Sequence, residues 1–78
     1  MPLEKHDLIH EFPEYREKIH ELKTNNPAFA RLYESYQATD HMVYRIESGA
    51  ENTSDDFLET QKKTRLHLKD QLYRMLQV

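Results

Sequence analysis

The sequence predicts an all-α protein: an antiparallel two-helix hairpin, coiled-coil-like in its pattern, with a shorter Pro-interrupted N-terminal helical segment. Residues that end helices occur in three places, at Pro13, at 25–27 and at 48–54. Between them, apolar residues recur at alternating spacings of three and four, which is typical of helices that pack together. With 78 residues and no cysteine, the chain has room for a single small helical domain over 1–78, held by helix packing or self-association.

The N-terminal helical segment is predicted over residues 1–24. Pro13 interrupts it, because proline in a helix interior removes one backbone hydrogen bond and crowds the preceding turn. We expect one short helix before this break and another from Pro13 to Lys23. The segment has a narrow apolar stripe suited to one partner surface, made of Leu8, Phe12, Tyr15, Ile19 and Leu22.

The first hairpin helix is predicted over residues 27–48. The Asn26 side chain can cap free backbone N–H groups, and Pro27 occupies a first-turn position where its missing N–H costs nothing. Gly49 supplies the matching stop, since glycine readily adopts the left-handed backbone that ends helices.

The second hairpin helix is predicted over residues 54–77, and either Thr53 or Ser54 can cap it. Arg65 falls on the seam, the line along which the two helices meet, where its stem can pack while its guanidinium reaches an acidic neighbour. The apolar residues expected to hold the hairpin together are Leu32, Tyr36, Val43, Ile46, Leu58, Leu68 and Leu72.

The apolar surface extends beyond the seam at Tyr33 and Tyr44 on the first long helix and at Leu66 and Tyr73 on the second. Two helices that face only each other need a narrow stripe each, so a third layer must pack on the hairpin. The layer is either the N-terminal stripe or a second copy in a four-helix assembly. The leading hypothesis is therefore a noncatalytic protein–protein interaction module. These four residues would bind a second copy, as a homodimer, or an unidentified helical partner.

A basic stripe on the second long helix, made of Lys62, Arg65 and Lys69, supports an alternative function as a nucleic-acid-binding accessory protein. Two simpler explanations compete with it. Bases toward the end of a helix suit the helix dipole, and glutamates of the N-terminal segment would neutralise the stripe if that segment packs there.

Other functional classes find no support in the sequence. His6, His10 and Glu14 have the spacing of metal ligands, but the break at Pro13 separates them and no fourth ligand follows at a recognisable spacing. Without cysteine or a glycine-rich loop, we expect no enzyme activity, no cofactor and no metal. The apolar runs are too short to cross a membrane, and the acidic N-terminus is unlike a secretory signal, so we expect a cytoplasmic location.

Three blocks carry a resemblance to a known family: HDLIHEFPEYREKIHELK at 6–23, FARLYESYQATDHMVYRIESG at 29–49 and SDDFLETQKKTRLHLKDQLYRML at 54–76. In their order and spacing they resemble the YdcH-like family of short bacterial proteins. The resemblance covers nearly the whole chain. It implies a bacterial source and a helical, cytoplasmic protein of unknown function, and it transfers no catalytic residue.

Overall fold

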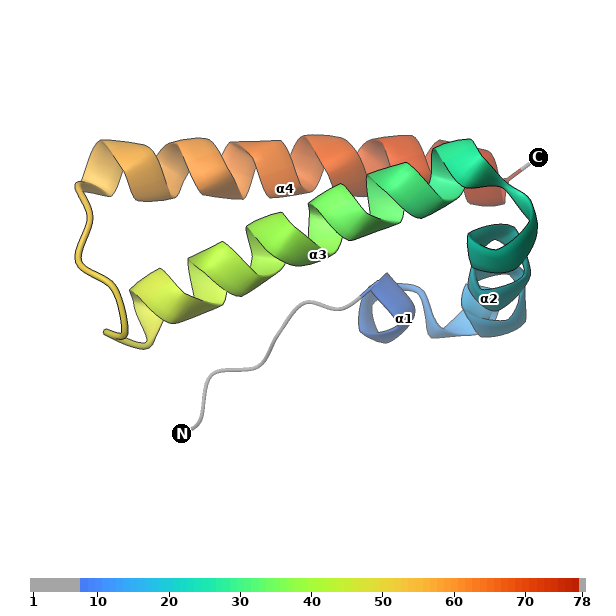
Figure 1. Cartoon of the computed structure of the whole chain (residues 1–78), viewed down its shortest axis with the longest axis horizontal. Helices are drawn as coiled ribbons and strands as arrows, with labels where there is room; N and C mark the ends of the chain where they lie inside the picture. Colours follow the sequence, from blue (N-terminus) through green and yellow to red (C-terminus); the bar gives the residue numbers. More distant parts are fainter. Residues whose placement is uncertain (1–7, 78) are drawn as a thin grey trace.

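The computed structural model describes residues 8–77, and every regular element in this range is helical. The elements in chain order are α1 (Leu8–Glu11), the 3-10 turn η1 (Pro13–Tyr15), α2 (Arg16–Asn25), α3 (Pro27–Glu47) and α4 (Asp55–Leu76). The two long helices form the antiparallel hairpin, and α1 and α2 gather at the end where α3 begins and α4 finishes (Figure 1). The predicted all-α hairpin with an interrupted N-terminal segment is confirmed.

Local chemistry sets the ends of both long helices. The Asn26 side-chain oxygen accepts a hydrogen bond from the Phe29 backbone N–H at 3.1 Å, which caps α3. The Ser54 hydroxyl accepts one from the Phe57 N–H at 3.2 Å, so Ser54 rather than Thr53 caps α4. After α3, Gly49 has a φ of 84°, the left-handed backbone expected of a helix stop.

Pro13 divides the N-terminal segment as predicted. The preceding residue, Phe12, leaves the helical region with φ −130° and ψ 66°, and Pro13 opens a single 3-10 turn. Part of the helix expected before Pro13 lies outside the described residues. The break allows α1 and α2 to approach the hairpin in different directions (Figure 1).

The N-terminal segment supplies the third layer that the sequence analysis required. Leu8 and Ile19 are fully buried and join a core cluster with residues of both long helices: Phe29, Tyr33, Tyr36, Leu72 and Leu76. Phe12, Tyr15 and Leu22 are partly buried against this cluster. One of the two expected layers is therefore part of the chain itself, while association with a second copy stays a prediction.

The seam is a mixture of buried and half-buried side chains. Tyr36, Val43 and Leu72 are completely buried. The remaining expected seam residues are half-buried: Leu32, Ile46, Leu58 and Leu68. The hairpin therefore leaves apolar surface accessible even where the two helices meet.

Candidate protein interaction surface

Tyr33 and Tyr73, two of the four residues predicted to bind a partner, face the N-terminal segment of their own chain. Tyr33 is 4% exposed, and the Lys23 ammonium of α2 lies 4.4 Å from its ring centroid. The Tyr73 ring stacks on Phe12 with 4.9 Å between centroids and meets Tyr15 edge-on at 6.0 Å. Tyr33 is thus a core residue rather than part of an accessible surface, because α2 lies over it.

Tyr44 and Leu66 lie on the same side of the hairpin as Tyr33 and Tyr73. Tyr44 follows Tyr33 by about three helical turns, and Leu66 precedes Tyr73 by about two. Tyr44 is half-buried, whereas Leu66 is 54% exposed. The structure thus brings the four residues to one side, but it leaves only Leu66 among them largely accessible.

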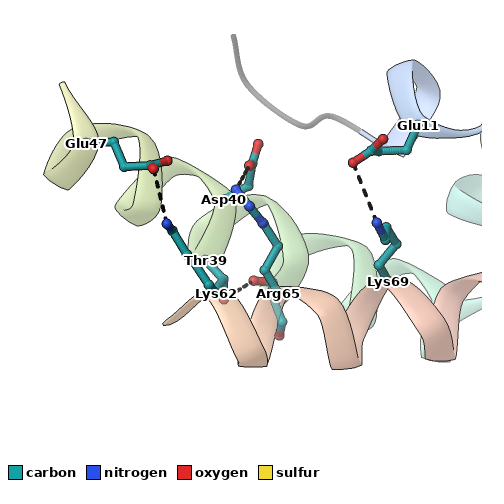
Figure 2. Close-up of polar contacts among 8 residues, drawn as sticks. Glu11, Thr39, Asp40, Glu47, Lys62, Arg65 and Lys69 are labelled. Carbon is teal, nitrogen blue, oxygen red and sulfur yellow. Dashed lines mark hydrogen bonds and ion pairs between the residues drawn. The ribbon is translucent and has the colours of Figure 1, made fainter. Parts of the chain in front are cut away.

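The three basic residues considered for nucleic-acid binding form a row of ion pairs along α4 (Figure 2). Lys62 pairs with Glu47 at 3.3 Å, Arg65 with Asp40 at 3.0 Å and Lys69 with Glu11 at 3.7 Å. Two carboxylates come from α3 and the third from α1. The guanidinium of Arg65 thus reaches an acidic neighbour as predicted, and Glu11 neutralises part of the stripe. A phosphate would have to compete with three carboxylates at this site.

A cavity of about 280 Å³ adjoins this row and is lined by Glu11, Tyr36, Lys62, Arg65, Leu66 and Lys69. Its charged groups already pair with one another or with α3. Catalysis by proton transfer needs a titratable group whose pKa suits the reaction and that can reach a substrate. The charged groups that line this cavity instead form ion pairs that join the helices.

The opposite side of the hairpin has a different chemistry, which the sequence analysis missed. On that side no charged side chain projects from α3 between residues 32 and 46 or from α4 between residues 57 and 71, given about 3.6 residues per turn. We call this surface the uncharged face. It consists of Leu32, Ser35, Thr39, Met42 and Ile46 on α3 and of Phe57, Gln61, Thr64, Leu68 and Gln71 on α4.

Phe57 shows how separate the two sides are. It is 40% exposed and, with Leu66, is one of the two large apolar side chains that are exposed in residues 8–77. Nine positions separate these two residues, about two and a half helical turns, so they point to opposite sides of α4. A partner that packs flat on the uncharged face would cover Phe57 and leave Leu66 in water.

The absence of charge from this face is unusual for this chain. Charged residues make up 32% of the sequence, so the seven positions that are not among the expected seam residues would hold about two by chance. Interface centres are depleted of charge, whereas ordinary helix surfaces exposed to water are not. Counting polar uncharged residues together with apolar ones would have shown the face in the sequence. Apolar spacing alone did not.

The two threonine hydroxyl groups on this face are already satisfied by their own helices. Thr39 donates to the Ser35 carbonyl and Thr64 to the Thr60 carbonyl, each at 2.9 Å. A buried hydroxyl is costly mainly when it loses its hydrogen-bond partner. Covering these threonines would therefore cost little, because their hydrogen bonds do not depend on water.

The structure describes two of the three residues that have the spacing of metal ligands. His6 lies outside the described residues, and His10 and Glu14 are exposed. Among residues 8–77 no three acidic or histidine side chains are grouped so as to hold a metal ion. In the same range no helix combines the length and apolar character needed to span a membrane.

Comparisons with known proteins agree with the resemblance. The model of a family described as Protein of unknown function (DUF465) matches residues 29–76, which cover most of the hairpin. The chain is 36% identical over 66 residues to proteins named Uncharacterized protein YdcH from Escherichia coli (strain K12) and from Shigella flexneri. Each match covers 85% of this chain and 89% of the relative. No solved structure matches the chain.

Proposed function

The chain belongs to the YdcH-like family described as Protein of unknown function (DUF465), and on that premise we propose that it is a noncatalytic protein interaction module. Its binding surface is the uncharged face. The family has no catalytic assignment to carry over, and its bacterial relatives are consistent with our proposal that the module works in the bacterial cytoplasm.

One observation carries the proposal: within residues 8–77, the N-terminal helices pack on the Tyr33 and Tyr73 side of the hairpin and leave the uncharged face open. On the covered side, Tyr33 and Tyr73 are occupied by Lys23, Phe12 and Tyr15. On the other side, the uncharged face combines exposed or half-buried apolar groups with two threonine hydroxyls that are satisfied within the helix. A protein that covers such a surface gains free energy from the apolar groups if it also supplies hydrogen bonds to the Ser35 hydroxyl and to the Gln61 and Gln71 amides.

The alternative function, nucleic-acid binding, has weaker support because its basic residues are already paired. Lys62, Arg65 and Lys69 each lie next to a carboxylate, and the net charge of the chain is −3. Binding to phosphates depends on unneutralised positive charge and weakens steeply as salt rises. We therefore place the functional surface on the side of the hairpin that carries no charge at all.

Cross-linking in living cells tests the proposal. A photoreactive amino acid is placed at Thr64 on the uncharged face, and in a second variant at Thr24 on α2. Both residues are exposed and both donate to the carbonyl four positions earlier, so the two substitutions are chemically matched. We expect protein cross-links from position 64 that persist after nuclease treatment, and few from position 24. Equal labelling at both positions, or adducts that nuclease removes, would overturn the proposal.

A further inference from the structure

We propose that the occupant of the uncharged face is a second copy of this chain, packed about a two-fold axis as a four-helix bundle. This inference rests on the proposed function and names the partner. Three properties of the described residues carry it: the chemistry of the face, its size and the charges around it.

The first property is self-complementarity. A surface without charge needs a partner surface without charge, since an unpaired charge buried against it would be costly. The chain itself carries such a surface, and a two-fold axis places the same surface of two copies against each other. Because each copy has a net charge of −3, contact through the uncharged face also keeps the carboxylates of the two copies away from the interface.

The second property is size. The uncharged face spans 15 residues of each helix, from 32 to 46 and from 57 to 71, which is about 22 Å in length, and the two helices side by side are about 20 Å wide. The face therefore offers roughly 450 Å² per copy, or roughly 900 Å² in a dimer, which lies in the range of weak, transient interfaces and below the roughly 1,200 Å² of a stable one. Two antiparallel hairpins that pack face to face also reproduce the ordinary four-helix bundle. The area fits a dimer that forms and dissociates reversibly.

The third property is the rim. Arg31 and Arg45 border the uncharged face along the outer side of α3, and Lys63 and Asp70 border it along α4. All four residues are exposed. A centre without charge inside a charged border is the usual anatomy of a protein interface. The border would keep the outer edges of the interface in water and limit further association.

Sedimentation equilibrium of the full chain tests the inference over concentrations from about 10 to 500 μM. We expect wild type to approach twice the chain mass of 9.5 kDa. Thr64→Lys places a charge in the middle of the face at an exposed position and should shift the protein to 9.5 kDa, with dimerisation weakened at least tenfold. Thr24→Lys makes the same change on α2 and should leave the dimer intact. Far-UV circular dichroism checks that both variants keep the helicity of wild type.

Leu66→Lys distinguishes the two sides of the hairpin. Leu66 is exposed on the side opposite Phe57, so this variant should remain a dimer. Dissociation of Leu66→Lys but not of Thr64→Lys would place the contact on the other side and overturn the inference. A monomeric wild type at 500 μM would also overturn it. If position 64 still cross-links another protein in cells in that case, the proposed function stands and only the identity of the partner is wrong.

Discussion

The Arg65 guanidinium lies 3.0 Å from the Asp40 carboxylate, and this ion pair joins the two long helices near the middle of the hairpin. The two side chains are 18% and 6% exposed, so the pair is much less accessible to water than the neighbouring pair of Lys62 and Glu47. Arg65 stands on the seam where an apolar residue would pack. Only one alignment of α3 against α4 brings its charge to Asp40, so we infer that the pair helps to set the register of the hairpin.

Removing the Asp40 charge should destabilise the protein. Asp40→Asn leaves a partly buried guanidinium without its anion, and we expect a loss of about 2 kcal/mol in the free energy of unfolding, below the 3–5 kcal/mol typical of fully buried pairs. The double variant Asp40→Asn/Arg65→Met should lose less free energy of unfolding than the sum of the losses of the two single variants, because it removes both charges. Urea denaturation at one fixed protein concentration measures all three variants.

Lys62→Gln is the matched control for this cycle. Its pair with Glu47 is over one third exposed on both side chains, and pairs of this kind contribute little in water. We expect a change within about 0.5 kcal/mol. A loss for Lys62→Gln as large as that for Asp40→Asn would show that burial does not distinguish the two pairs.

The stacking of Phe12 on Tyr73 predicts how the N-terminal segment is attached. Phe12→Ala removes the stacked ring and its contact with Tyr15. Because Phe12 is half-buried, we expect a loss of about 1–2 kcal/mol, less than for a fully buried phenylalanine. Hydrogen exchange should speed up in α2 while the centres of α3 and α4 stay protected. Glu17→Ala, an exposed change in the same segment, should leave exchange in α2 unchanged. Uniform acceleration along all helices would argue against a separately attached segment.

Substitutions of Gly49 should change the stability of the protein only through the backbone conformation at this position. Its φ of 84° is unfavourable for residues with a Cβ, yet a Cβ built there would meet no heavy atom within 4 Å. Gly49→Ala should therefore cost about 1 kcal/mol without a steric clash. Gly49→Asn should cost less, because asparagine tolerates the left-handed region better. Thermal unfolding of the two variants measures the difference, and equal losses would indicate that some other property of Gly49 matters.

The parts of the fold that depend only on residues close together in the sequence were predictable from the sequence. Asn26, Ser54 and Gly49 act on backbone groups within a few positions, so their chemistry alone locates the helix ends. Helical periodicity likewise predicts which side chains of α3 and α4 meet. These features need no knowledge of where the rest of the chain lies.

The surface of the hairpin was harder to predict. Burial of Tyr33 depends on the direction that α2 takes across α3, and that direction follows from the extended backbone of Asn26 and the break at Pro13. Apolar spacing predicted that Tyr33 and Tyr73 lie on the side of a third layer, but not that the N-terminal segment would already occupy them. The uncharged face was missed because threonine and glutamine do not contribute to an apolar pattern, although their lack of charge is what distinguishes this side.

The Tyr15 phenol predicts a pH dependence. Burial raises the pKa of Tyr15 above its ordinary value, and the adjacent Tyr73 and Glu14 raise it further. The folded protein thus holds the phenol proton more tightly than the unfolded chain does. The associated stability is fully present below the pKa of an unfolded tyrosine, about 10, and is lost as the pH rises through the higher folded value. Alkaline conditions should therefore weaken the contact between Tyr15 and Tyr73 and release the N-terminal segment.

Tyr15→Phe separates this titration from packing. The variant keeps an aromatic ring against Tyr73 but has no proton to lose, so its stability relative to wild type should increase as the pH rises above about 10. Urea denaturation at neutral pH and at several pH values above 10 measures the difference. Near neutral pH we expect the two proteins to differ little, because the phenol proton is bound in both the folded and the unfolded state of wild type. A constant difference across the whole pH range would mean that the Tyr15 proton is held equally in the folded and unfolded states.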